Sequence, residues 1–235
     1  MIDEIRSTVL YILNKDNNGY VSPEQFNLYA RQAQLSIFEQ YFHDFSLANN
    51  KMNNHTHTSG HSDIPKRMEE VINSFTDQAV LVFNPITLRF QIPSDKYSMG
   101  TILTGAMTVE VDQVHHNKIP YLISSLDTTP DTNYPVCSII GNEIQVYPSS
   151  LNSTGDIIAN YVRYPADPKW TYTSITNGDP LFNPAAAGYQ DFELPKDDEI
   201  NIIMKILLYS GSEIRDPEIV KLAKTEELQE KQEQK

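Results

Sequence analysis

Apolar residues recur at helical spacing at the start of the chain. One face of residues 2–13 carries four apolar positions that predict a helix, namely Ile2, Ile5, Val9 and either Ile12 or Leu13. The pattern stops at residues 14–19, where Asn, Asp and Gly are typical of a turn. The chain is therefore predicted to begin with a short amphipathic helix followed by a tight connection.

A second helix is predicted from Ser22 to about Phe45. Ser22 is a favourable N-cap, Pro23 suits the first helical position, and Gln25 completes a capping box. Its apolar residues form two stripes, which are Phe26, Ala30, Ala33, Ile37 and Tyr41, and Leu28, Leu35, Phe38, Phe42 and Phe45. Two stripes indicate contact with more than one neighbour. The second neighbour is either another subunit or the rest of the same domain, and the pattern leaves both open.

Residues 47–63 are polar and are predicted to form a mobile loop. His55, His57 and His61 resemble a zinc cluster, but no cysteine lies nearby and the loop lacks the apolar residues that would hold ligands rigidly. A polar loop without metal is the better interpretation. Residues 65–75 then predict a further short helix.

Between residues 79 and 164 the apolar period changes towards two. The candidate strands are Ala79–Phe83, Leu88–Gln91, Met107–Val114, Val136–Ile140, Glu143–Tyr147 and Ile157–Tyr164. Gly141 and Asn142, between two of these strands, predict a tight hairpin. This region is predicted to be an antiparallel sheet or sandwich.

Residues 165–195 lack a regular pattern and contain five prolines. Long ordered loops of this kind commonly make contacts rather than form the scaffold. Because aromatic side chains tend to dominate interfaces, we expect some of those in this segment to pack on an adjacent subunit. The interface candidates are Trp170, Tyr172, Phe182, Tyr189 and Phe192.

Helices are predicted again after Asp197. Glu199–Tyr209 has helical spacing with Gly211 as its C-cap, and Pro217 begins a last helix. Beyond Leu228 that helix is wholly polar, so its end is expected to be flexible in the isolated protein. The predicted fold class is α+β. Residues 1–75 and 196–235 would form a helical part, and residues 76–195 a β-rich part with long contact loops.

Composition narrows the function. The net charge of −13 is spread along the chain without a basic stripe, so tight nucleic-acid binding is not expected. No stretch suits a membrane span, and residues 1–20 do not resemble an export signal. Cys137 lies in an apolar run and is expected to be a buried hydrophobe. Because no catalytic motif is present, we predict a protein that is not an enzyme and needs no cofactor.

A calcium site is the sharpest alternative. With Gly19 at position six of an EF-hand loop, Asn14, Asp16 and Asn18 fall at positions one, three and five. Position one, however, is Asn rather than Asp, and Gln25 at position twelve cannot supply a bidentate carboxylate. We therefore reject this metal site, and a degenerate EF-hand-like calcium-binding protein stays a secondary alternative.

Two stretches resemble a known group of virion proteins. The first is residues 14–27 (NKDNNGYVSPEQFN) leading into 30–34, and the second is 141–148, followed by 161–165 (YVRYP), 191–195 (DFELP) and 215–218 (RDPE). Together they resemble structural proteins of crAss-like and related phages of Bacteroidetes. More remotely, they are similar to the tail tubular protein A type of head-to-tail adaptor in short-tailed phages.

This resemblance implies a structural subunit of a homo-oligomeric ring, commonly dodecameric, in the virion neck at the head-to-tail junction, assembled in the host cytoplasm. The helical part would dock on the portal protein and the sheet part would extend towards the tail or other ring proteins. Genomic DNA would pass through without specific binding. The resemblance brings no active-site residues. A virion accessory or carbohydrate-binding module is the alternative, although it would not need capped helices in both end regions.

Overall fold

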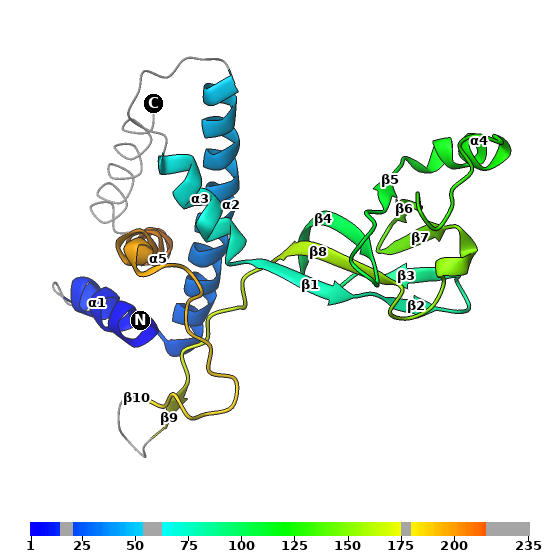
Figure 1. Cartoon of the computed structure of the whole chain (residues 1–235). Coiled ribbons are helices and arrows are strands. Elements are labelled where there is room, and N and C mark those ends of the chain that lie inside the picture. Colours follow the sequence, from blue (N-terminus) through cyan, green and yellow to red (C-terminus); the bar gives the residue numbers. More distant parts are fainter. Residues whose placement is uncertain (15–20, 54–62, 175–179, 215–235) are drawn as a thin grey trace. The chain divides into compact units, whose positions relative to one another are not determined.

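The computed structural model describes residues 1–14, 21–53, 63–174 and 180–214, and it has the predicted α+β fold. The chain divides into two compact units (Figure 1). The helical unit comprises residues 1–71 and 165–235, and the β unit comprises residues 72–164. No helix among the described residues is both long and apolar enough to cross a membrane.

The helical unit is built on two helices that both pack against a third. α1 (Ile2–Asn14) and α2 (Pro23–Asn53) contact α5 (Glu199–Ile214), which follows the short 3-10 helix η3 (Lys196–Asp198). The core of this unit consists of Ile2, Ile5, Val9, Leu13, Phe26, Ala30, Ala33, Ile37, Phe38, Ile202, Ile206 and Leu207. The first predicted stripe of α2 is mostly buried, whereas only Phe38 of the second is, and Leu28 is 52% exposed. α3 (Asp63–Asn73) confirms the helix predicted at residues 65–75.

The capping box at the start of α2 is confirmed. The Ser22 N–H donates to Gln25 Oε1 at 3.0 Å, and the Gln25 N–H donates to Ser22 Oγ at 3.2 Å. Each side chain thus satisfies a backbone donor that the first turn of a helix leaves unpaired. This pairing fixes where α2 begins, and it gives Gln25 a role in capping.

Two helix ends lie beyond their predicted positions. α2 continues to Asn53, so the loop predicted from residue 47 is wrong for residues 47–53. α5 passes through the buried Gly211 to Ile214, so Gly211 is not a C-cap. In both cases the backbone hydrogen bonds of the continuing helix outweigh the small cost of residues that disfavour a helix. The rest of the predicted loop, the helix from Pro217 and the polar end lie outside the described residues.

Two sheets make up most of the β unit. The three-stranded sheet is antiparallel and has the order β1 (Thr76–Val80), β8 (Ile157–Arg163) and β4 (Lys96–Thr104). The five-stranded sheet has the order β2 (Val82–Asn84), β3 (Arg89–Gln91), β7 (Glu143–Tyr147), β6 (Val136–Ile140) and β5 (Asp112–Gln113). Only Leu81 separates β1 from β2, so the single strand predicted at residues 79–83 passes from one sheet to the other.

Both sheets contribute side chains to one hydrophobic core. Its buried members are Leu81, Phe90, Ile92, Ile102, Val111, Cys137, Ile144, Val146, Ile157 and Ala159. The predicted hairpin is confirmed, and Gly141 has the positive φ, +64°, that the first position of a type II′ turn requires. The sheet pairings are antiparallel except for the parallel pair β5–β6.

The strand predictions need two corrections. β4 was missed, because its sequence includes Gly100 and polar residues, and bulges interrupt its pairing with β8. The strand predicted at Met107–Val114 is mostly a turn and a bridge, with only Asp112–Gln113 in a ladder. Met107 occupies a turn with a φ of +53°, and its N–H donates to the Thr104 carbonyl at 2.7 Å.

Two further segments are short and irregular. Between β5 and β6 the chain makes an excursion that holds the 3-10 helix η1 (His116–Lys118) and α4 (Ile119–Ser124). In the helical unit, β9 (Tyr172–Thr173) pairs with β10 (Leu181–Phe182). The predicted division of the chain is therefore wrong for residues 165–195, which belong to the helical unit rather than to the β-rich part.

Candidate interaction site

The segment 165–195 is fixed to α2 through side-chain amides. The Trp170 N–H donates to Asn27 Oδ1 at 2.8 Å, and Asn27 Nδ2 donates to the Trp170 carbonyl at 3.1 Å. This pairing replaces the contact that a neighbouring strand would make. Asn27 thereby satisfies both backbone groups of Trp170, and this holds the loop around Trp170 against α2.

A second amide joins the two ends of the segment. The buried Gln34 donates from Nε2 to the Ala166 carbonyl at 2.7 Å and accepts the Glu193 N–H on Oε1 at 3.1 Å. The Glu193 carboxylate in turn accepts the Ala166 N–H at 2.9 Å. Gln34, Ala166 and Glu193 thus form a closed set of hydrogen bonds, and each part supports the others in a poorly solvated place.

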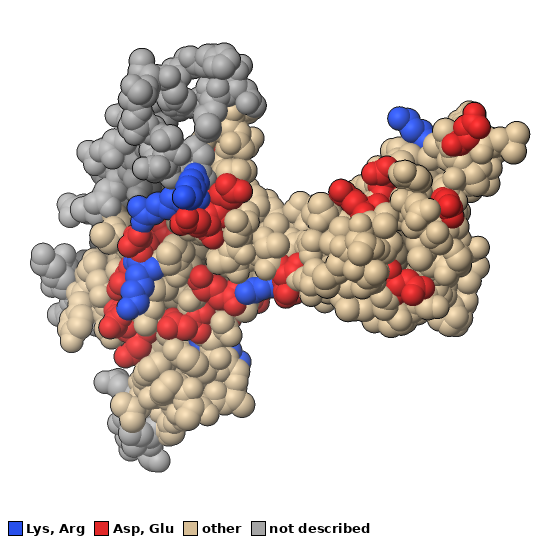
Figure 2. All heavy atoms as spheres, in the orientation of Figure 1, with Lys and Arg blue, Asp and Glu red and all other residues tan. Residues whose placement is uncertain are grey.

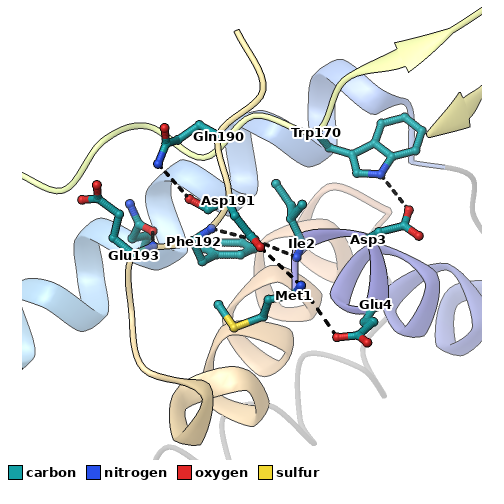
Figure 3. A network of polar contacts seen from close by, with 10 residues as sticks. Met1, Ile2, Asp3, Glu4, Trp170, Gln190, Asp191, Phe192 and Glu193 are labelled. Carbon is teal, nitrogen blue, oxygen red and sulfur yellow. Dashed lines mark hydrogen bonds and ion pairs between the residues drawn. The ribbon is translucent and has the colours of Figure 1, made fainter. Parts of the chain in front are cut away.

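Asp191 connects the same segment to the start of α1 (Figure 3). Its Oδ1 accepts the Ile2 N–H at 2.9 Å and its own neighbour's N–H, that of Phe192, at 2.8 Å. Its Oδ2 lies 3.3 Å from the Met1 nitrogen. A carboxylate at the N-terminus of a helix pairs with free N–H groups and with the helix dipole. Asp191 therefore acts as an N-cap that comes from a distant part of the chain.

Trp170 is the centre of an aromatic and charged cluster. Its indole Nε1 donates to Asp3 Oδ1 at 2.9 Å (Figure 3), and the Arg6 guanidinium carbon lies 3.9 Å from its ring centroid. Tyr172 and Phe182, which are paired on β9 and β10, both stack on the indole with centroid distances of 5.7 and 5.8 Å. Such a cation–π contact and such ring pairs each add stability beyond the apolar area that they bury.

These contacts correct part of the interface prediction. Trp170 and Phe192 are buried within their own unit, so their rings are not available to a neighbouring subunit. Phe182 and Tyr189 are half-buried and pack edge to face on each other, with centroids 5.8 Å apart. Tyr172 is 41% exposed. Of the five candidates, Tyr172 therefore presents the largest accessible surface, and whether it touches another chain stays a prediction.

A buried carboxylate joins α2 to the start of α5. The Tyr41 hydroxyl donates to Asp198 Oδ2 at 2.5 Å, and Asn201 Nδ2 lies 3.4 Å from Oδ1. Burial raises the pKa of the Asp198 carboxyl, an effect that the bonds from Tyr41 and Asn201 partly oppose. Next to it, Arg67 forms an exposed ion pair with Asp197. This arrangement fixes two helices against each other.

The β unit, in contrast, exposes large apolar side chains along one edge. We define the hairpin edge as residues 80–88, which include the end of β1, strand β2 and the turn before β3. Its exposed apolar residues are Val80, Val82, Ile86 and Leu88, and Ile86 is 91% exposed. β2 is the outermost strand of the five-stranded sheet. The turn is set by Asn84, whose Oδ1 accepts the Ile86 N–H at 3.0 Å, so Ile86 is held at its tip.

A second exposed apolar surface lies at the other edge of that sheet. We define the α4 excursion as residues 114–135, which connect β5 to β6. Ile119 anchors it because this side chain is buried, whereas other large apolar residues point to solvent: Tyr121, Ile123, Leu126 and Tyr134. Leu126 is 99% exposed. Clusters of this kind on a soluble protein commonly mark interaction sites.

Neither surface is predicted from the sequence pattern, although one signal in the sequence points to both. Residues 72–164 hold 12 charged residues among 93, against 37 among 142 in the helical unit. No Asp, Glu, Lys or Arg occurs in residues 78–88 or 119–126. In the face shown in Figure 2, charged side chains are mixed over the helical unit, whereas most of the β unit surface carries none. The two surfaces are therefore marked by exposed stretches of sequence that contain no charged residue.

The other predicted sites gain little from the structure. Asp16, Asn18 and the histidines 55, 57 and 61 lie outside the described residues, and of Asn14 only the backbone is described. Within the described residues no group of three or more His, Cys, Asp or Glu side chains could hold a metal ion. Cys137 is buried in the core of the β unit, as expected, and burial raises the pKa of its thiol to about 12.

Comparison with known proteins adds no identification. No protein-family model matches the chain, and no curated protein matches it.

Proposed function

We propose that this chain is a structural subunit of an oligomeric ring in the neck of a tailed bacteriophage, where it connects the portal to the tail. One observation carries the structural half of this proposal: the β unit exposes large apolar side chains at both edges of its five-stranded sheet. Exposed apolar surface of this extent is costly in a free monomer and useful in an assembly. The phage context comes from the sequence resemblance.

The helical unit supports the same proposal. The described parts of residues 165–195 are tied to α1 and α2 through Asn27, Gln34 and Asp191. In the proposal this unit docks on the portal, and the β unit extends towards the tail.

The charge of the chain is compatible with a DNA channel. A net charge of −13 repels phosphate, so a wall made of many copies would let DNA slide rather than hold it. In the proposal the genome therefore passes the ring without sequence-specific contact. The ring is expected to be homo-oligomeric, with twelve copies implied by the resemblance.

Co-expression with the portal protein of the same phage tests the proposal. Native mass spectrometry of the purified complex should show portal rings that carry one complete ring of this chain. A mixture in which the portal and this chain stay separate at micromolar concentrations would contradict the proposal. A chain that instead binds a polysaccharide column, with no portal complex, would favour the carbohydrate-binding alternative.

A further inference from the structure

The two apolar surfaces of the β unit indicate how one copy meets the next. We infer that copies of this chain associate head to tail, with the hairpin edge of one copy packed on the α4 excursion of its neighbour. This inference rests on the proposed function, because it names the contact that would build the ring. The partner that covers each surface is thus a second copy of this chain.

The two surfaces lie at opposite ends of one rigid sheet. The sheet order runs from β2, beside the hairpin edge, to β5, beside the α4 excursion (Figure 1). Four interstrand spacings of about 4.8 Å separate the outer strands, so the edges lie about 19 Å apart. The two surfaces of one β unit therefore cannot cover each other.

The area of the two surfaces suits a stable contact. Given their exposed fractions, the two tyrosines and two aliphatic residues of the α4 excursion expose on the order of 500 Å², and the hairpin edge exposes on the order of 300 Å². A standard interface takes about 800 Å² from each partner, of which somewhat more than half is apolar. Each surface is therefore near the apolar share that one partner contributes.

Charge favours these two surfaces over the rest of the molecule. Two copies of a chain with a net charge of −13 repel each other, and this repulsion is smallest where the facing segments carry no charge. Residues 78–88 and 119–126 are such segments, and Lys118, Asp127 and Asp131 are the charged residues in the rest of the α4 excursion. Interface centres are likewise depleted of charged residues and enriched in aromatic ones, as Tyr121 and Tyr134 would supply here.

Side chains rather than added strands make this contact. At the outer edge of β2 the Phe83 N–H already donates to Thr154 Oγ1 at 3.2 Å. This bond occupies one backbone donor that strand addition would use, so we place the contact in the side chains. Ile86, held at the turn, is the protruding group, and Leu126 is the most exposed apolar group of the surface that receives it.

A contact between two different surfaces has a consequence for the assembly. Such heterologous contacts form closed rings if the rotation between copies closes, and open filaments if it does not. They never stop at a symmetric dimer. This property separates the inference from a contact in which two hairpin edges, or two α4 excursions, pair with each other.

Three single variants test the inference by sedimentation velocity on the full chain. Ile86→Asp places a charge on the hairpin edge, and Leu126→Asp places one on the α4 excursion, so each variant disrupts one of the two apolar surfaces. Ile200→Asp is the matched control, because it places the same charge on an exposed isoleucine of α5. Each of the first two variants should weaken self-association about 30-fold or more, while the control associates like the wild type. Circular dichroism checks that all three are folded.

Mixing the two variants gives the decisive test. Ile86→Asp chains keep the α4 excursion and Leu126→Asp chains keep the hairpin edge, so an equimolar mixture should form 1:1 dimers that grow no further. Either variant pairing with itself as the wild type does, or a mixture that stays monomeric, overturns the inference. A wild-type chain that stays monomeric up to about 1 mM also overturns it. Because portal binding is measured separately, a chain that binds the portal but fails here leaves the proposed function standing.

Discussion

The two units of this chain differ in charge and in where the most exposed apolar side chains lie. The helical unit is rich in charge, and it buries Phe192 and Trp170, the latter hydrogen-bonded to Asp3 of α1 and Asn27 of α2. The β unit is poor in charge, and it leaves Ile86 and Leu126 almost fully exposed. An aromatic-rich loop segment in the first unit is therefore core, whereas short unremarkable turns in the second form the accessible surface.

This difference shows that aromatic content alone does not locate an interface. Trp170 has an indole N–H donor and a face that attracts cations, and Asp3 and Arg6 supply partners for both. Ile86 and Leu126 have no polar group that could be satisfied locally. Removing their side chains from water would be favourable, and this is why we place the contacts between copies there.

The largest expected effect comes from removing the centre of the helical unit. Trp170→Ala should lower the free energy of unfolding of that unit by about 3–5 kcal/mol, because it opens a cavity and leaves Asp3 and Arg6 without their aromatic partner. Urea unfolding followed by circular dichroism at helical wavelengths measures it. Tyr172→Ala, at an exposed neighbour in the same stack, should cost less than about 1 kcal/mol. Equal losses for both variants would show that Trp170 is not core.

Disrupting the contact between α2 and α5 should cause the second largest loss of stability. Tyr41→Phe removes the hydroxyl that donates to the buried Asp198 carboxylate and should cost about 1–3 kcal/mol. The matched change Tyr11→Phe, at a tyrosine that is 79% exposed, should leave the unfolding free energy within about 0.5 kcal/mol of the wild type. If both variants unfold at the same denaturant concentration, the Tyr41 bond adds nothing to stability.

Removing the distant N-cap of α1 should have a smaller effect. Asp191→Ala deletes the acceptor of the Ile2 N–H and should destabilise the helical unit by about 1–2 kcal/mol. Asp167→Ala is the control, because Asp167 forms only an exposed ion pair with Arg31 and should cost at most about 0.5 kcal/mol. A loss for Asp167→Ala as large as that for Asp191→Ala would argue against a specific cap.

The smallest effect is a pH dependence that Asp198 introduces. Because burial raises its pKa in the folded state above the unfolded value, the folded state binds this proton more tightly. Its contribution to stability is therefore greatest below the unfolded pKa and is lost as pH rises through the folded value. The unfolding free energy of the wild type minus that of Asp198→Asn should fall as pH rises above the ordinary pKa of an aspartate carboxyl. A difference that rises with pH would mean that the hydrogen bonds outweigh burial.

Much of the secondary structure could be predicted because it rests on local chemistry. The capping box of Ser22 and Gln25 and the Gly141 turn are encoded in adjacent residues, and the structure has both where the sequence predicts them. β4 could not be predicted in this way, because its pairing with β8 joins residues distant in sequence and tolerates Gly100. Such pairings depend on tertiary contacts more than on the strand's own pattern.

The candidate site was harder to predict for the same reason. The sequence shows that residues 165–195 are aromatic, but not that Asn27, Gln34 and Asp3 lie where they can satisfy and bury them. Exposure is likewise a property of the fold. The uncharged runs at 78–88 and 119–126 suit a buried strand as well as a contact surface, and only the sheet order separates the two.

Disulfide cross-linking measures the contact between copies most directly. The double variant Ile86→Cys/Leu126→Cys places one thiol on each apolar surface, while the native Cys137 stays buried. After mild oxidation of the assembled protein, denaturing gels should show a ladder of dimers, trimers and larger species, which reducing agent converts to monomer. Ile86→Cys/Ile200→Cys, with its second thiol on the helical unit, should give no ladder. Monomer alone in the first variant, or equal ladders in both, would contradict assembly through the two edges of the β unit.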